Sequence, residues 1–227
     1  MSEVVFLTAR EKLTKNLRDL YETLDASDVV TASFFISKCQ DYVNAGKVAL
    51  VIGSRDQRLG HEGRTLLHNA AQYGNLPAVN FLLQQEGSSV MMLNSFDSSS
   101  SLITPLMLAI SANAVDVAVV LIASGAKLNL QDKNGENIFH FAARMGSSRT
   151  LKRLVEVSQL SGQHIQALAT TQNIKLKFPE DLSHGICHLV LVSYREHGHY
   201  TTHQRPKRQS SKARKAAKKT SLIESFS

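Results

Sequence analysis

The chain has 227 residues, 43% of them hydrophobic, which is an ordinary composition for a folded protein. It contains no run of about eighteen apolar residues, so a membrane-spanning helix is not expected. Its 26 basic and 19 acidic residues give a formal net charge of +7. Two cysteines, Cys39 and Cys187, lie far apart without metal-type spacing, which indicates an intracellular, reducing compartment.

Residues 1–61 are expected to form a helical N-terminal region. Within it, segments 32–43 and 47–53 have the composition of a helix pair. Two interpretations stay open for this pair. It is either a degenerate capping unit of the repeats that follow, since terminal repeats are usually atypical, or a set of unrelated helices packed against them.

A six-residue motif then occurs three times, as TLLHNA at 65–70, TPLMLA at 104–109 and NIFHFA at 137–142. The second and third copies are 33 residues apart and the first and second 39 apart, so we expect a six-residue insertion between the first two. The opening Thr or Asn suits a helix N-cap, because its side-chain oxygen can accept a bond from an unpaired backbone N–H. Pro105 suits the first helical turn.

Each motif is followed by a second stretch with apolar residues at helical spacing, at 78–83, 116–122 and 149–155. Gly74 and Gly146 stand where the first helix of a unit should end, before the second stretch begins. Each copy therefore predicts a pair of antiparallel helices. Such a pair cannot bury its own apolar face and is stable only when stacked on a neighbour.

The 33-residue period and this motif resemble those of the ankyrin repeat family over about 62–156. The resemblance implies an all-α repeat solenoid: a stack of three clear ankyrin helical hairpins plus degenerate end units. We expect the stack to cover 62–200. Its units are expected at 62–101, 102–133, 134–170 and, in degenerate form, 171–200. The last begins near Phe178, 41 residues after Asn137, which requires an insertion near 161–171.

Residues 201–227 are expected to form a disordered basic tail. Eight of the basic residues lie in 205–219, which has no acidic residue, so the rest of the chain is nearly neutral. Three interpretations stay open: a nuclear signal read by an import receptor, contact with nucleic-acid phosphates, or a solubilising charge run. The nuclear-signal residues are Lys207, Arg208, Lys212, Arg214, Lys215, Lys218 and Lys219. Phosphorylation at neighbouring hydroxyls would weaken the signal by adding negative charge; the candidates are Ser210, Ser211, Thr220 and Ser221.

The ankyrin resemblance implies that protein partners bind the turn tips and the concave face made by the first helices. At the tips this gives Arg64, Phe96, Asp97, Lys133 and Glu136. On the first helices it gives Asn69, Gln72, Tyr73, Asn113, Arg144 and Met145. Aromatic and arginine side chains dominate interface energetics, which favours Tyr73, Phe96 and Arg144.

No catalytic residue, cofactor or metal is expected, because there is no nucleophile elbow, phosphate-cradling glycine loop or metalloprotease motif. His184, Cys187 and His188 are zinc-ligand types, but no Cys-x-x-Cys pair accompanies them. His68 and His140 occupy the His of the repeated motif, and the resemblance implies a structural role for them in bonds to neighbouring turns.

The stretch 125–144 is similar to units of IκB-type ankyrin proteins, and the chain lacks the Asp-Ser-Gly-x-x-Ser degradation signal of the cytoplasmic inhibitors. This resemblance implies a non-enzymatic regulator, located in the nucleus or shuttling with the cytoplasm, that holds a Rel-type transcription factor. Two alternatives stay open. One is a chromatin-associated scaffold unrelated to Rel factors, and the other is a host-directed ankyrin protein of a virus or parasite.

Overall fold

The computed structural model describes residues 9–24, 29–58, 63–85, 92–98, 101–145, 148–160 and 165–197. Its α-helices are α1 (Ala9–Glu22), α2 (Val29–Asn44), α3 (Val48–Ile52), α4 (Leu66–Gln72), α5 (Leu76–Gln84), α7 (Pro105–Ser111), α8 (Val115–Ala123), α9 (Ile138–Met145), α10 (Ser148–Leu160), α11 (Ile165–Ala169) and α12 (Gly185–His197). A short 3-10 helix, η1 (Pro179–Leu182), precedes α12.

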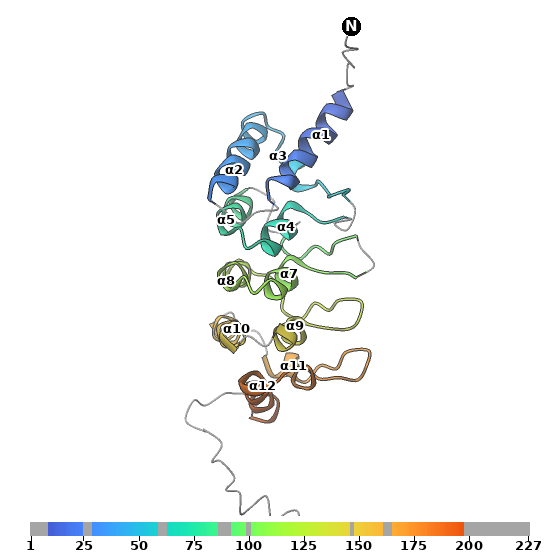
Figure 1. Cartoon of the computed structure of the whole chain (residues 1–227), viewed down its shortest axis with the longest axis vertical. Helices are drawn as coiled ribbons and strands as arrows, with labels where there is room; N and C mark the ends of the chain where they lie inside the picture. The colour runs from blue at the N-terminus through green and yellow to red at the C-terminus, as the bar shows by residue number, and fades with distance from the viewer. Residues whose placement is uncertain are drawn as a thin grey trace, which may run out of the picture.

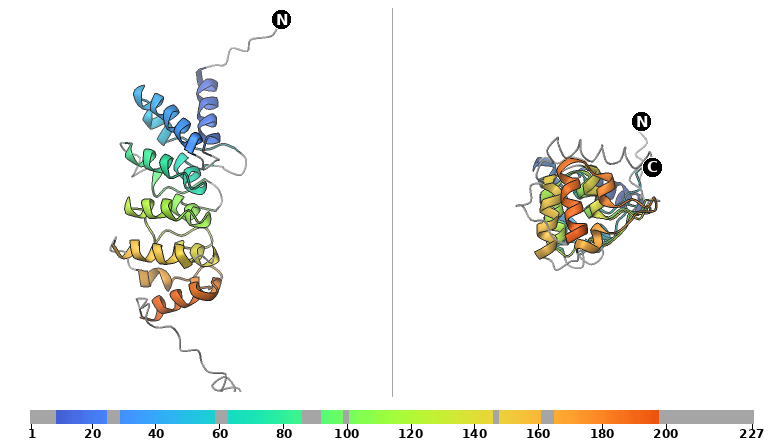
Figure 2. Two further views of the ribbon diagram at one scale, coloured as in Figure 1. Left: turned by 60° about the vertical axis from the view of Figure 1, so that its left-hand side comes forward. Right: turned by 90° about the horizontal axis from the view of Figure 1, so that it is seen from below.

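The helices stack in two columns along the long axis of the molecule, as Figure 1 shows. In the inner column α4 packs against α7, α7 against α9, and α9 against η1. In the outer column α2, α5, α8, α10 and α12 follow one another. Figure 2 shows the same layers from the side and from below, with the loops gathered along one edge. The expected all-α repeat solenoid is therefore confirmed.

The three motif copies occupy equivalent places in this architecture. The side chain of Thr65 accepts a bond from the backbone N–H of His68, and that of Thr104 accepts one from Met107 at 3.3 Å. Asn137 Oδ1 accepts bonds from the N–H groups of Phe139 and His140, at 3.0 and 3.3 Å. All three residues cap the first helix of a helical pair. We call these pairs unit 1 (α4 and α5), unit 2 (α7 and α8) and unit 3 (α9 and α10).

Histidines of the motif tie one unit to the next. The backbone N–H of Thr65 donates to Nδ1 of His68 at 3.1 Å, and Nε2 of His68 donates to the Ile103 carbonyl at 3.0 Å. His140 repeats this arrangement: Nδ1 accepts from Asn137 N–H at 3.2 Å and Nε2 donates to the Lys177 carbonyl at 3.2 Å. The structural role expected for both histidines is confirmed. Unit 2 has Met107 at the same position, so it makes no such bond.

A hairpin loop precedes each unit, and its first and last residues pair through the backbone. Hairpin 1 is 56–64, hairpin 2 is 97–103, hairpin 3 is 132–136 and hairpin 4 is 173–177. The N–H of the first residue donates to the carbonyl of the last at 2.7, 2.9, 3.0 and 3.0 Å, in that order. Hairpin 2 is two residues longer than hairpin 3, so it contains two of the six inserted residues. The other four lie between the end of α5 and the start of hairpin 2.

Residues after unit 3 form a shortened pair, which we call unit 4 (η1 and α12). Phe178 stands at its N-cap position, directly after the Lys177 carbonyl that His140 binds. Its first helix is a single 3-10 turn of four residues. Before it, α10 runs for 13 residues where α8 has nine, and α11 follows. These additions account for the longer spacing from Asn137 to Phe178.

At the other end, the two segments expected upstream are helical, as α2 and α3. The helix α2 continues the outer column by packing against α5. The hydroxyl of Tyr21, in the last turn of α1, lies 2.9 Å from Ser54 Oγ and donates to the Arg64 carbonyl at 3.2 Å. We propose that α1, α2 and α3 close this end of the stack.

One apolar core runs through the whole stack, from Leu20 near the first end to Tyr194 in α12. Among the described residues, no helix is long and apolar enough to cross a membrane. The residues expected to form the nuclear signal and its phosphorylation sites lie outside the described residues. They are Lys207, Arg208, Ser210, Ser211, Lys212, Arg214, Lys215, Lys218, Lys219, Thr220 and Ser221.

Candidate partner-binding surface

The inner helices expose only their last turn. In α4, α7 and α9 the first six residues are all buried, from Leu66 to Ala71, Pro105 to Ile110 and Ile138 to Ala143. The exposed or half-buried side chains that follow are Gln72, Tyr73, Ser111, Asn113, Arg144 and Met145. A partner on the concave face would therefore meet the ends of these helices and the hairpins beside them.

Three residues expected on the binding surface are buried instead, which corrects the sequence analysis. Asn69 lies on the inward side of α4, where its Nδ2 donates to Asp56 Oδ2 at 3.0 Å. Asp97 opens hairpin 2, where its Oδ1 accepts from Ile103 N–H at 2.9 Å. Glu136 closes hairpin 3, where its Oε1 accepts from Asn173 Nδ2 at 3.1 Å. These side chains hold the hairpins together.

Asp56 shows how strongly the first hairpin is fixed. Both of its carboxylate oxygens accept bonds from Arg58, the shortest at 2.7 Å, and one also accepts from Asn69. Burial alone would raise the pKa of Asp56, but the bonds from Arg58 and Asn69 outweigh burial and hold it below its usual value. The carboxylate is thus charged and structural. The six-residue motif begins after this position and gives no sign of its role.

Two polar pairs connect a hairpin to the end of the helix it precedes. Arg64, half-buried at the end of hairpin 1, donates to Gln72 Oε1 at the end of α4. At the equivalent places in unit 3, Glu136 accepts from Arg144, whose guanidinium also lies 5.7 Å from the centre of the Phe141 ring. The pairs join the tips and the concave face into one surface.

The remaining residues expected on the binding surface differ in the exposure of their side chains. Lys133 and Met145 are exposed, and Tyr73 is half-buried. Phe96 is half-buried beside hairpin 2, and its carbonyl accepts from Arg55 Nη1 at 2.8 Å. Asn113 is exposed but also has a structural role. Its φ of +56° matches that of Gly74 at the same place in unit 1, and its Oδ1 accepts from Thr150 Oγ1 at 2.6 Å.

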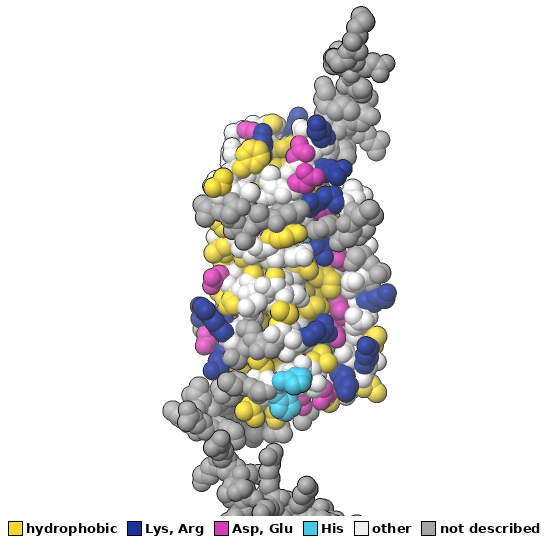
Figure 3. All heavy atoms as spheres, in the orientation of Figure 1, with side chains coloured by type: hydrophobic (Ala, Val, Ile, Leu, Met, Phe, Trp, Pro, Cys, Tyr) yellow, Lys and Arg dark blue, Asp and Glu magenta, His cyan; other side chains and the backbone are white. Residues whose placement is uncertain are grey.

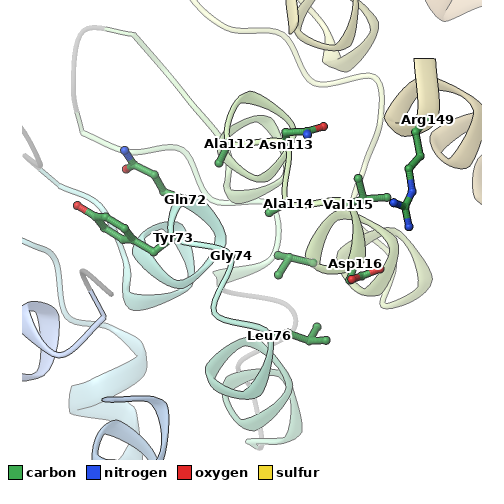
Figure 4. Close-up of a pocket in the computed structure, with 11 residues that line it drawn as sticks. Gln72, Tyr73, Gly74, Leu76, Ala112, Asn113, Ala114, Val115, Asp116 and Arg149 are labelled. Atoms are coloured by element: carbon green, nitrogen blue, oxygen red, sulfur yellow. The ribbon is translucent and has the colours of Figure 1, made fainter. Parts of the chain in front are cut away.

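A hollow of about 460 Å³ lies between the helix turns of units 1 and 2. Figure 4 shows Gln72 and Tyr73 on one of its sides, and Asn113 and Arg149 on the other. A larger hollow of about 1120 Å³ lies among α1, α2 and α3, where Phe34 and Leu50 are exposed. The helices that line the second hollow are at the opposite end of the stack from α12 (Figure 1).

Among the described residues, no group of three or more His, Cys, Asp or Glu side chains is placed to hold a metal ion. His188 is used within unit 4, where its Nδ1 donates to the Glu180 carbonyl at 3.0 Å.

Comparison with known proteins agrees with this architecture. Residues 42–132 match the family model described as Ankyrin repeats (3 copies). The human B-cell lymphoma 3 protein is 32% identical over 102 residues, which are 44% of this chain and 21% of that protein. The NF-kappa-B inhibitor alpha of Gallus gallus is 27% identical over 138 residues, which are 61% of this chain and 42% of the inhibitor.

The E3 ubiquitin-protein ligase KEG of Arabidopsis thaliana is 35% identical over 81 residues, 36% of this chain and 5% of the ligase. The chain therefore aligns with less than half the length of each of these three relatives. Ankyrin repeats are therefore confirmed over 42–132, and the similarity to IκB-type proteins is weak but present.

Proposed function

We propose that this chain, which carries ankyrin repeats, is a nuclear regulator that holds a Rel-type transcription factor and changes its DNA binding. The repeats themselves are a protein-binding module. The observation that carries the finer proposal is the similarity to the NF-kappa-B inhibitor alpha, which extends over 138 residues, 61% of the chain, and so over more of it than the ankyrin match at 42–132. The half-buried end of α4 and the exposed end of α9, beside the hairpins, supply the contact surface.

Alanine at Met145 is expected to weaken binding to the cognate Rel-type factor by about tenfold, or about 1.4 kcal/mol, which is the cost of truncating a hot-spot residue. Leu189→Ala on α12 is the matched control, because Leu189 is 46% exposed and Met145 44%, and it should change affinity less than twofold. Titration calorimetry with the full chain and the purified DNA-binding region of the factor measures both. Proximity labelling in native cells that returns no Rel-type protein would refute the proposal.

The basic tail is proposed to carry the chain into the nucleus. Replacing Lys207, Arg208, Lys212, Arg214, Lys215, Lys218 and Lys219 by Gln in the full chain is expected to equalise its nuclear and cytoplasmic concentrations. Changing only the lysines to Arg keeps the charge and should preserve nuclear accumulation. Fluorescence imaging with a tag too large to diffuse through the pore measures the ratio. Undiminished nuclear accumulation of the Gln variant would show that the tail is not the signal.

A second candidate is an adaptor that recruits a protein unrelated to Rel factors. The 35% identity to the KEG ligase supports it, because a protein named for a different activity aligns with this chain at a similar level of identity. The same proximity labelling separates the two candidates. Chromatin proteins at the head of the labelled set, without Rel factors, would favour the adaptor.

A further inference from the structure

The four hairpins share one backbone feature. The residue before the last one has a positive φ in each: +72° at Gly63, +55° at Leu102, +70° at Gly135 and +57° at Leu176. Glycine adopts this left-handed conformation readily, whereas a leucine is strained in it by contact of its Cβ with the backbone. Hairpins 1 and 3 therefore have the residue that this position favours, and hairpins 2 and 4 do not.

Burial of the two leucine side chains does little to offset this backbone strain. Leu102 is 44% exposed and Leu176 is 73% exposed, and Ile174 in the same hairpin is also exposed. By contrast, hairpin 1 has no room for a side chain, since a Cβ at Gly63 would lie 2.1 Å from Ser98 Cβ. A strained position with an exposed apolar side chain is typical of a functional contact rather than of a stabilising one.

Hairpins 2, 3 and 4 are joined side by side through the backbone. The N–H of Lys133 donates to the Ser101 carbonyl at 2.9 Å, and the N–H of Ile174 donates to the Asn134 carbonyl at 2.8 Å. The exposed side chains of these loops consequently form one continuous strip. We call it the hairpin edge and define it as Leu102, Lys133, Ile174, Lys175, Leu176 and Lys177.

The charge of the hairpin edge is basic. Its three lysines are exposed, and none forms a salt bridge with another described residue. The carboxylates of Asp132 and Glu136 in hairpin 3 are buried and bonded. Asp181 is exposed beyond hairpin 4, but its Oδ2 accepts from Phe178 N–H at 2.9 Å. Figure 3 shows basic and apolar side chains next to one another along the lower part of this side.

We propose that the hairpin edge binds an acidic segment of a protein partner, with apolar side chains of the segment resting on Leu102, Ile174 and Leu176. Lysines 133, 175 and 177 supply the complementary charge. The inference rests on the proposed role as a protein-binding module, because it names the chemistry of the partner at the tips. It does not depend on the partner being a Rel-type factor.

The first test measures the anisotropy of a fluorescein-labelled peptide, Asp-Glu-Phe-Asp-Glu-Leu repeated twice, with the full chain. Replacing Lys133, Lys175 and Lys177 together by Gln is expected to weaken binding about tenfold or more. The matched control replaces the exposed Lys38, Lys47 and Lys152 by Gln, removes the same charge and should change affinity less than twofold. The basic tail is present in every protein, so its attraction for the peptide is common to all.

The second test uses the backbone strain. Leu102→Gly and Leu176→Gly are each expected to raise the melting temperature, by about 2–4 °C, because glycine accepts the positive φ. The same substitutions should weaken peptide binding about fivefold, since the apolar contact is gone. A residue with a purely structural role would behave differently, because its loss would lower the melting temperature.

Three results would overturn the inference: equal loss of affinity in the two lysine triple variants, equal affinity for a peptide with Asn and Gln in place of its acids, or a lower melting temperature in both glycine variants. Failure here is distinguishable from failure of the Rel assignment. If the chain binds the acidic peptide through the hairpin edge but binds no Rel-type factor, the hairpin-edge inference stands and the Rel assignment is refuted. If it binds a Rel-type factor but not the acidic peptide, the Rel assignment stands and the hairpin-edge inference is refuted.

Discussion

Replacing Leu121 by Ala is expected to lower the free energy of unfolding by about 2–5 kcal/mol. Leu121 is fully buried in α8, in the middle of the stack, and α8 packs against α5, α7 and α10. The substitution therefore opens a cavity that neighbouring units share. In a repeat array each unit is stabilised mainly by its neighbours, so the loss should spread to units 1 and 3.

Urea denaturation followed by circular dichroism measures this loss, with Leu189→Ala as the control because that leucine is on α12 and partly exposed. The control should lose less than about 1 kcal/mol, as is usual for surface positions away from buried features. Loss of cooperativity in the Leu121→Ala transition would indicate that the units unfold separately. Equal stability of the two variants would contradict the placement of Leu121 in the core.

Lowering the pH from 7.5 to 4.5 is expected to destabilise the fold by about 2–3 kcal/mol through His68, since the unfolded chain titrates about two pH units above the lower limit of this range and each unit corresponds to about 1.4 kcal/mol. Burial lowers the pKa of His68 from its ordinary 6.5 to about 4. Its Nδ1 also accepts a bond from Thr65 N–H, which protonation would break. Between those two pKa values the unfolded chain binds the proton and the folded chain does not. Stability therefore falls as the pH falls through this window.

His140 acts in the same direction, because burial lowers its pKa too. Asp56 acts in a different range. Its folded pKa is below the ordinary 3.8, so its contribution is present above that value and is lost only at lower pH. The slope of stability against pH between 6.5 and 4.5 is thus assigned to the two buried histidines.

The measurement is the urea-derived free energy of unfolding at several pH values for the chain, for His68→Gln and for His184→Gln. The His68 variant should show a smaller slope whatever its absolute stability, because the titrating group is gone. His184→Gln is the matched substitution at an exposed histidine. An unchanged slope in His68→Gln would mean that the buried imidazole does not control acid sensitivity.

The repeat period predicted the inner column well because it depends on local chemistry. Thr65, Thr104 and Asn137 cap helices through their own side chains, and the apolar residues after them have helical spacing. The surface residues were harder to predict. A position relative to the motif does not reveal a side-chain bond to a distant loop, and such bonds bury Asn69, Asp97 and Glu136.

A sequence signal for the hairpins does exist. An Asp or Asn opens each of them, at Asp56, Asp97, Asp132 and Asn173, and each is buried. Its distance from the following N-cap varies with loop length, so a search for a fixed period misses it. Leu102 and Leu176 carry no signal at all, because leucine has no preference for the left-handed conformation that they adopt. Only the backbone reveals these positions.

Because Met107 replaces the histidine of the motif, the joints between neighbouring units differ in their hydrogen bonds. Imidazole-to-carbonyl bonds join units 1 and 2 through His68 and units 3 and 4 through His140. The joint between units 2 and 3 has the Asn113–Thr150 bond and the Lys133–Ser101 backbone bond, but Met107 supplies no imidazole there. Under tension or at the onset of denaturation, we expect the array to part first at this central joint. The molecule would then behave as two paired halves hinged in the middle, able to adjust its curvature to a ligand that spans both.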